Sequence, residues 1–417
     1  MPIVEPFLDP NQCGGLSKTS TNHYLIKLMD FIHTTLDMRT PHAAVLAALD
    51  LSKAYNRGDS LVIEDLHAMH TPGWLLAILC SYLSSRSLVL SYQQACSSPR
   101  PLPGGYSAGT LMGGFLFIIK FNGICLRPAI PRPNGNRAIQ LKFVDDSSKA
   151  ASVDLRNSLI PDPKTRQFPL RYTERTQMVL HPDENVLQHE LTRFQRETQT
   201  QNFVTNKNKT FIMLFNSSRK YAFPPEFTLG QEELAVKTNH KILGVMVQDD
   251  ARWGTQVEHM TKKASKKIWL LRRMKKLGVD EATIACFWKA EGLCHLEYCS
   301  PVWSGALTKQ QKQDLARVHR RAVAAITGFS TKGEEFVANC QRLGLENDLS
   351  ARRLRLAKKF AKRTAENSRH MDLFKRLENP PVTRRSGKLY REPPCRTHRH
   401  LQSARPYLTR LLNGESN

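Results

Sequence analysis

Two short apolar runs in the first half of the chain end at acidic residues. The run 43–49 consists of small and apolar residues over the length of a strand and stops at Asp50. The run 141–144 stops at the adjacent acids Asp145 and Asp146. Short apolar runs of this length are typical of buried strands. Two such strands side by side would bring three carboxylates to one edge of a sheet.

Longer segments of the first half are predicted to be helical. A glycine-rich basic turn over 12–21 precedes the first of these helices, and a second glycine-rich stretch, 104–114, opens an apolar helix. The segment 151–184 contains several prolines and has no clear period, so it is predicted to be a loop insertion. The other helices are expected over 23–36, 61–92 and 185–198.

The second half of the chain has a helical period. Apolar residues recur from Trp253 onward at the spacing of one helix face, and further helices are predicted over 280–297 and 309–327. The other faces of the first of these helices carry many cations, among them Lys262, Lys263, Lys266, Arg272 and Arg273. Such a helix can lie along a nucleic-acid backbone or on an anionic lipid surface.

The charge balance indicates which class of partner this basic surface would bind. Lys and Arg number 61 against 37 Asp and Glu, which gives a net charge of +24 and a pI near 9.8 in a chain of 417 residues. The excess predicts a polyanionic partner whose binding weakens with salt, and nucleic acid is the first expectation. A membrane is not expected, because no apolar run approaches the ~18 residues that a spanning helix needs.

Neither the N-terminus nor the cysteine usage indicates a secreted protein. The N-terminus has no basic start and no apolar signal core, and nine cysteines without a C-x-x-C pair resemble neither a disulfide framework nor a zinc site. An intracellular protein of the nucleus or cytoplasm is expected. The segment 351–417 carries 18 Lys and Arg against 5 Asp and Glu, and its proline-rich part, 380–406, is predicted to be poorly ordered or to order on nucleic acid.

Three carboxylates at one point have a defined chemical use. Like charges repel one another and resist burial unless a counter-charge such as a divalent cation occupies the site. Two metal ions roughly 4 Å apart in such a cluster stabilise the attacking and the leaving oxygen of phosphoryl transfer. Aspartate is also common in turns, so a plain turn at Asp145 and a strand-end acid at Asp50 are the alternative.

The order of the motifs resembles the reverse transcriptases of non-LTR (LINE-type) retrotransposons over roughly residues 10–330. Q-x-G-G-L-S-K-T-S-T over 12–21 is similar to the family's fingers motif, and L-D-L-S-K-A-Y from Leu49 is similar to the palm motif with the first metal-binding aspartate. F-V-D-D-S from Phe143 resembles the second acidic motif. The glycine-rich segment 104–117 and N-K-N-K-T over 206–210 also have counterparts in the family.

The resemblance implies a right-hand polymerase of the α+β class. Its palm would be an antiparallel sheet with helices, its fingers would be reduced, and its thumb would be mostly helical. The implied segments are partial fingers at 1–42, the palm at 43–250, the thumb at 251–350 and a basic, partly disordered tail at 351–417. RNA template, DNA primer and dNTPs are the implied partners, and the basic thumb helix would contact the duplex.

The resemblance also implies roles around the carboxylates. Asp50, Asp145 and Asp146 would form the metal site: Asp50 and Asp145 would bind Mg²⁺, with Mn²⁺ as the alternative ion, and Asp146 would support them. Lys209 would donate a proton to the leaving pyrophosphate, because this chemistry needs an acid near the departing oxygens. A surface lysine at a strand edge is the alternative for Lys209.

Four further residues would surround the substrate. Tyr55 would exclude the 2′-hydroxyl of a ribonucleotide, or it is an ordinary aromatic residue of the palm core. Lys18 would contact the triphosphate, or it is a solvated lysine of a turn. Gly105 and Gly109 would let the nascent base pair approach the backbone.

The sequence departs from the family at two places. Ser107 and Ala108 stand where the family has proline and glutamine, which removes an amide contact to the substrate. The family's upstream fingers strands are also missing, so a truncated copy is expected. The chain is then either an RNA-directed DNA polymerase domain that extends primers weakly or not at all by itself, or a catalytically impaired remnant that only binds RNA.

Overall fold

The computed structural model of the chain describes residues 3–102, 104–124, 137–161, 178–218, 223, 225–328, 333–378 and 388–414. The chain divides into two units. The first unit is Met1–Tyr24 with Thr40–Lys237, and the second is Leu25–Arg39 with Thr238–Asn417. The division falls within helix α1 (Thr21–Leu36). The four segments expected from the sequence group the chain differently and remain a prediction.

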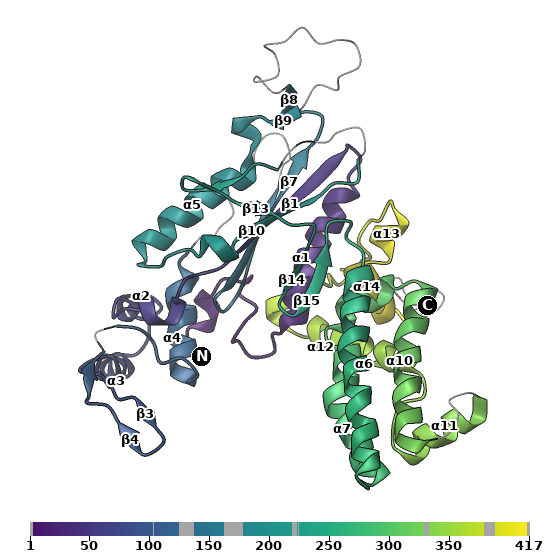
Figure 1. Ribbon diagram of the computed structural model, residues 1–417. Helices are drawn as coiled ribbons and strands as arrows, with labels where there is room; N and C mark the ends of the chain where they lie inside the picture. The colour runs from purple at the N-terminus through teal and green to yellow at the C-terminus, as the bar shows by residue number, and fades with distance from the viewer. Residues whose placement is uncertain are drawn as a thin grey trace. The chain divides into compact units, whose positions relative to one another are not determined.

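The first unit is built on a five-stranded sheet in the order β13-β10-β1-β7-β6 (Figure 1). β1 pairs antiparallel with both β7 and β10, and β6 pairs antiparallel with β7. The edge pair β10 and β13 is parallel, so the sheet is mixed, although the sequence predicted an antiparallel one. The strands are β1 (His42–Leu49), β6 (Ala138–Phe143), β7 (Asp146–Asp154), β10 (Phe211–Phe215) and β13 (Ala235–Val236).

The central strand β1 is buried on both faces, which explains its unbroken run of small and apolar residues. Val45, Ala47 and Leu49 alternate along the strand and therefore point to the same face, where they join one core cluster. Helix side chains complete that cluster, among them Phe117 and Phe194. The helices that contribute include α2 (Val62–Ala68), α4 (Leu111–Asn122) and α5 (Val186–Thr200).

Two expectations for the first unit were wrong in extent. The helix predicted over 61–92 ends with α3 (Gly73–Leu83), and the chain then forms two short antiparallel pairs. The inner pair, β3 with β4, extends away from the end of α3 (Figure 1). These strands are β2 (Ser87–Leu88), β3 (Ser91–Tyr92), β4 (Ala95–Cys96) and β5 (Arg100–Pro101).

The predicted loop insertion 151–184 begins later than expected, because β7 continues to Asp154 along β1. A second pair of strands follows, β8 (Leu159–Pro161) with β9 (Met178–Leu180). The part of the insertion at 162–177 lies outside the described residues. Pairing with β1 extends β7 where the sequence alone had no apolar period to indicate a strand.

The second unit contains most of α1, followed from Thr238 by the hairpin β14–β15 and then by helices, as the period of the sequence predicted. α10 begins with a capping box made by Thr308 and Gln311 and ends at Gly328, which has φ 82°. It packs beside α6 (Figure 1). The main elements are β14 (Asn239–Ile242), β15 (Val245–Gln248), α6 (Gly254–Lys276), α7 (Glu281–Trp288), α8 (Cys294–Glu297), α9 (Ser300–Trp303), α10 (Lys309–Thr327) and α11 (Gly333–Arg342).

The basic tail is folded where the structure describes it, in contrast to the expected disorder. Helix α12 (Leu349–Ala365) packs against α9 and α14, and α14 buries Tyr407 and Leu408. Short α13 (His398–Leu401) precedes α14 (Ala404–Leu412). Residues 379–387, which belong to the stretch predicted to be poorly ordered, lie outside the described residues.

Among the helices of the described residues, none combines the length and the apolar character needed to cross a bilayer. The longest, α6, instead buries one narrow face. Val257, Met260 and Leu271 are buried on it, as are Ala264 and Ile268. The cations predicted from its sequence are exposed.

A buried ion pair joins β7 to α5 and offers a test of this packing. Lys149 Nζ lies 2.7 Å from Glu190 Oε2, and the two side chains are 2% and 5% exposed. Glu190→Gln should lower the free energy of unfolding by about 3–5 kcal/mol, because the lysine charge stays buried without its partner. Denaturant unfolding would measure this loss.

The double variant Lys149→Met/Glu190→Leu should recover most of the stability, since it removes both charges. Glu197→Gln is the matched control on the same helix. It breaks the partly exposed pair with Arg193 and should cost less than about 1 kcal/mol. Equal losses for the two single glutamine variants would contradict the assignment.

Candidate active site

The hairpin between β6 and β7 presents the acidic pair at one end of the sheet. Phe143 pairs with Asp146, so Val144 and Asp145 form a two-residue turn. The last pair of β1 with β7 is Leu49 with Ser147, so Asp50 follows at the same end, next to Asp146. The register of the antiparallel strands therefore brings Asp50 to the pair Asp145 and Asp146, which follows it by almost a hundred residues in the sequence.

The turn of this hairpin is strained. Val144 has φ 60°, in the left-handed region that β-branched residues rarely adopt. Strain of this kind persists only where the surrounding structure enforces it, and such residues cluster at functional sites. The turn therefore requires contacts that hold it, and the structure provides them.

Asp50 is held by the segment Asn206–Thr210. The Asp50 N–H donates to Thr210 Oγ1 at 3.4 Å, and the Asp50 carbonyl accepts from the Asn206 N–H at 2.7 Å. Lys209 Nζ lies 3.9 Å from Asp50 Oδ2. The N-x-x-K-T motif thus wraps the end of β1 and places one cation beside its carboxylate.

The electrostatics of the site are those of crowded like charges. Partial burial raises the pKa of Asp50, Asp145 adds to the rise, and Lys209 and a hydrogen bond from Asn206 oppose it. Loss of surrounding water, followed by the charges of Asp145 and Asp50, raises the pKa of Asp146 to about 6, although part of its side chain stays exposed. The charge of Asp145 thus acts on both Asp50 and Asp146, and a cation placed among the three carboxylates would relieve the repulsion.

Tyr55 belongs to the same neighbourhood. Its ring stacks on Phe117 of α4, with centroids 4.9 Å apart. Partial burial and the charge of Asp145 raise the pKa of its hydroxyl. Both interpretations of Tyr55 therefore have a basis, since the ring packs on the core and the hydroxyl lies near the acidic turn.

The glycine-rich segment is fixed to the backbone beside Tyr55. Gly105 has φ 88°, and a Cβ on it would lie 3.2 Å from the Tyr55 carbonyl oxygen and from the Asn56 Cα. The Tyr106 N–H donates to the same carbonyl at 2.7 Å. Gly105 is thus required for a close backbone approach, whereas Gly109, with φ 80°, faces open space.

Lys18 and the predicted cations of α6 lie at exposed positions. Lys18 is exposed in the turn before α1, with φ 56°. The five cations predicted to contact nucleic acid are all exposed on α6, in the second unit. They are Lys262, Lys263, Lys266, Arg272 and Arg273.

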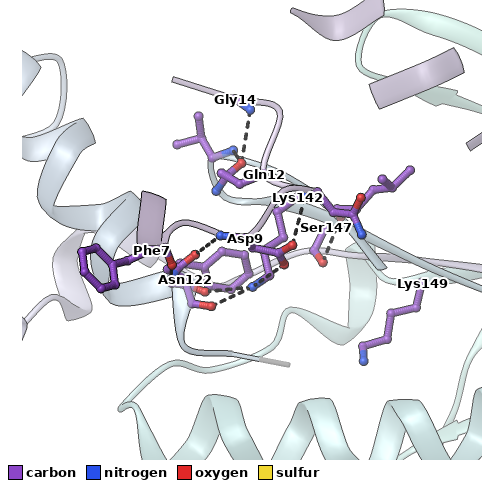
Figure 2. A network of polar contacts seen from close by, with 12 residues as sticks. Phe7, Asp9, Gln12, Gly14, Asn122, Lys142, Ser147 and Lys149 are labelled. Carbon is purple, nitrogen blue, oxygen red and sulfur yellow. Dashed lines mark hydrogen bonds and ion pairs between the residues drawn. The ribbon is translucent and has the colours of Figure 1, made fainter. Parts of the chain in front are cut away.

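The residue of the 12–21 turn that reaches the acidic hairpin is Gln12, to which the sequence alone gave no role. Gln12 Oε1 accepts from the N–H of Val144 and from that of Gly14, both at 3.2 Å (Figure 2). Gln12 is fully buried. A Cβ on Gly14 would lie 2.5 Å from the Val144 nitrogen, so only glycine allows the two backbones to approach this closely. The sequence motif located the turn, but only the fold shows that Gln12 is the side chain that binds the backbone of the acidic hairpin.

A buried lysine anchors the same hairpin from below. Lys142 of β6 is fully buried, and its Nζ donates to the carbonyls of Phe121 and Asn122 at 3.3 and 3.1 Å and lies 3.5 Å from Asp9 Oδ2 (Figure 2). The Asp9 N–H donates to Asn122 Oδ1 at 2.7 Å. The end of α4 and the N-terminal segment are thereby tied to the strand that leads into the acidic turn.

The carboxylates at this turn do not form a complete metal site by themselves, so a magnesium ion there would need further oxygens from substrate or water. Within the described residues, no three His, Cys, Asp or Glu side chains are arranged as a group that could hold a metal ion by themselves. Mg²⁺ is commonly bound through one or two carboxylates together with waters and substrate phosphates, not in an all-protein cage. Mutually repelling carboxylates at an accessible turn match that mode of binding.

Comparisons with known proteins give limited likeness. No protein-family model matches the chain, and no curated protein gives a significant match to it. Among solved structures, a telomerase from Candida tropicalis in complex with the TWJ fragment of telomeric RNA aligns with a TM-score of 0.40 and 9% identity. The alignment covers 85% of this chain and 52% of that one.

The corresponding telomerase complex from Candida albicans aligns with a TM-score of 0.30 and 8% identity, over 89% of this chain and 56% of that one. The chain thus spans about half the length of the telomerase chains that it matches. Likenesses this weak assign no activity to the chain.

The crowding of the carboxylates can be tested by titration. We expect Asp146 to titrate near pH 6, and Asp50→Asn should lower its pKa by removing a neighbouring negative charge. Carbon-detected NMR of the Asp146 carboxyl would measure both values. Asp183→Asn, at an exposed site, is the control and should leave the pKa unchanged. An unchanged pKa in Asp50→Asn would show that the two carboxyls are not neighbours.

The raised pKa of Asp146 also determines how its contribution to the stability of the fold changes with pH. The folded-state pKa of Asp146 lies above the value of ~3.9 for an unperturbed aspartate. Between about pH 4 and pH 6 the folded chain therefore binds more protons than the unfolded chain, so the contribution of Asp146 to stability falls as pH rises through that window.

The support of the acidic turn by Gln12 can be tested separately. Gln12→Met removes the acceptor and leaves the N–H groups of Val144 and Gly14 buried without it, which should lower stability by about 1–3 kcal/mol. Hydrogen exchange at the Val144 amide should become faster. Gln313→Met, at an exposed position of α10, is the control. Unchanged exchange at Val144 would contradict the hydrogen bond.

Proposed function

We propose that the chain is the RNA-directed DNA polymerase domain of a retrotransposon, transferring a nucleotidyl group from a dNTP to a primer 3′-hydroxyl. The observation that carries the proposal is the convergence of Asp50, Asp145 and Asp146 at one end of the sheet, with Lys209 and Tyr55 beside them. The five residues come from three separate segments of sequence. Their order also resembles non-LTR reverse transcriptases.

Asp50 and Asp145 would hold Mg²⁺ or Mn²⁺, and Asp146 would support them. When bound there, the metal supplies positive charge next to the reacting phosphate. The raised pKa of Asp146, which comes from lost hydration and from the charges of Asp145 and Asp50, supports this assignment, because a cation bound there would offset the repulsion. The strained turn keeps Asp145 at the tip of the hairpin, where a substrate phosphate can reach it.

Lys209 is suited to act on the leaving group. Its side chain is 71% exposed, and its Nζ lies 3.9 Å from the Asp50 carboxylate. An ammonium group in this position can move toward bound phosphates without losing its anchor at the strand end. It would hold a proton at Nζ and donate it to the departing pyrophosphate.

Tyr55 would discriminate between sugars. The ring is supported from below by Phe117, so it presents a rigid surface and cannot easily swing away. A 2′-hydroxyl on the incoming nucleotide would meet that surface, whereas a deoxyribose would not. This role explains why a bulky aromatic residue lies beside the acidic turn.

RNA template and DNA primer would bind through phosphates. The exposed cations of α6 are spread around the helix and do not form one base-reading element. Binding is therefore expected to depend strongly on salt and little on base sequence.

A second candidate is a nucleic-acid-binding remnant without catalysis. Ala108 favours it, because an exposed alanine stands in the glycine-rich segment where the resembling family has a glutamine. Phosphoryl transfer depends on positioning as well as on metals, so removal of one substrate-binding group can abolish activity even where the carboxylate cluster is intact.

Primer extension decides between the two candidates. On an RNA template with Mg²⁺ or Mn²⁺, Asp145→Asn should reduce extension by roughly a hundred-fold or more, since a group that acts on the transition state is removed. Affinity for the RNA–DNA hybrid should stay within about twofold, because binding rests on the cations of α6. The measurement is extension of a labelled primer with hybrid affinity measured in parallel.

Asp183→Asn is the control and should leave extension unchanged, since that side chain is 86% exposed and lies outside the carboxylate cluster. Extension that survives Asp145→Asn would overturn the polymerase proposal. Tight hybrid binding by the unmodified chain without extension under either metal would support the second candidate.

A further inference from the structure

The second unit contains a cavity of about 760 Å³ that none of these roles uses. All of its lining residues belong to the second unit. Its walls come from α1, the turn between β15 and α6, the residues that lead into α10, and α13. The charged residues of the lining are all cations, namely Arg252, Lys312 and Arg399, and the histidines His33 and His398 accompany them.

These three cations have no carboxylate partner among the residues that the structure describes. Elsewhere in the same unit, cations are commonly paired. Lys267 Nζ lies 2.8 Å from Glu291 Oε2, and Arg405 Nη1 lies 2.7 Å from Asp30 Oδ2. The nearest acid in sequence, Asp250, accepts the Arg252 backbone N–H at 2.8 Å but does not line the cavity. The lining of the cavity therefore contains three cations and no acid.

One wall of the cavity is built by a buried acid outside it. Asp37, at the end of α1, accepts from the N–H groups of Arg396 and Thr397 at 2.6 and 2.8 Å. His400 Nδ1 lies 2.9 Å from Asp37 Oδ2, and the His400 ring stacks on His33. These contacts fix α13, and with it Arg399, beside α1. The wall is thus preorganised.

The opposite wall is the start of α10. Thr308 and Gln311 of its capping box line the cavity, and Lys312 follows in the first turn. α10 has 19 residues, and the N-terminus of a helix favours anions. The helix end thus adds to the field of the three cations.

We propose that this cavity binds backbone phosphates of a nucleic-acid strand. Two guanidinium groups and one ammonium group can each take a phosphate oxygen, and guanidinium does so with two parallel hydrogen bonds. The volume lies within the range of ligand pockets. That the phosphates belong to a polynucleotide rests on the proposed function, whereas the unpaired cations of the cavity do not.

The double variant Lys312→Gln/Arg399→Gln tests the proposal in the full chain. Its affinity for a labelled single-stranded RNA, measured by fluorescence anisotropy at several salt concentrations, should be about tenfold lower. The magnitude of the slope of log affinity against log salt should fall by about 1.4, roughly 0.7 for each phosphate of the single strand that the variant no longer neutralises. Lys359→Gln/Arg363→Gln is the matched control, because it removes the same two charge types from exposed positions of α12.

Equal reductions of affinity and slope in the two double variants would overturn the proposal, since net charge alone would then explain binding. Free phosphate is tested as the other source of the same chemistry. Inorganic phosphate that raises the melting temperature of the unmodified chain but not of the cavity variant, with RNA affinity unchanged, would overturn the polynucleotide assignment.

A charge-conserving variant keeps the proposal testable if the glutamine double variant does not fold. Lys312→Arg/Arg399→Lys should keep the melting temperature, and its RNA affinity should fall less than that of the glutamine pair because both charges remain. A loss of affinity equal to that of the glutamine pair in this folded variant would contradict phosphate binding. Failure of the proposed function remains distinguishable: an unmodified chain that binds RNA through the cavity but extends no primer would contradict the polymerase and support the cavity.

Discussion

The organisation of the first unit depends on the mutual repulsion of three carboxylates at one end of a sheet. Loss of surrounding water, followed by the charges of Asp145 and Asp50, raises the pKa of Asp146 to about 6, and lost hydration and the charge of Asp145 also raise the pKa of Asp50. Such an arrangement destabilises the fold unless other contacts hold it or a cation occupies it. The neighbouring hydrogen bonds are best understood as the contacts that offset this repulsion.

Two buried polar residues, Gln12 and Lys142, hold the acidic hairpin. Gln12 accepts from the backbone of the strained turn at Val144, and Lys142 ties the preceding strand to the end of α4 and to Asp9. Buried polar groups are costly when unpaired, so each of them fixes one geometry and excludes others. The acidic turn is thus held by buried contacts, while Asp145 and Asp146 at its end stay exposed.

The second unit uses charge in a different way. Its cations are spread along α6 and around a cavity, and many of those elsewhere are paired with acids. Spread cations hold a polyanion without reading it, whereas the unpaired cations at Arg252, Lys312 and Arg399 define a place with a preferred occupant. The net charge of +24 therefore includes two kinds of cation: spread ones, which would give affinity for a polyanion, and those of the cavity, which would fix where it binds.

The sequence by itself determined the elements and the candidate carboxylates. The unbroken apolar run of β1, the helical period of α6 and α10, and the placing of acids at strand ends are local patterns, and local patterns follow from burial and helix geometry. It could not determine the parallel edge pair β10–β13, the extension of β7 to Asp154, or the folding of the basic tail through Asp37. Each of these depends on a partner that is distant along the chain.

The same reason explains why the sequence indicated Lys18, whereas the structure places Gln12 at the acidic turn. Both lie in one motif, and residue chemistry favoured the lysine, because a cation suits a phosphate. Which side chain of a turn points inward is decided by the backbone that packs on it, here the approach of Gly14 to Val144. Only the tertiary structure brings those two segments together, so only the tertiary structure could assign Gln12 to the acidic turn.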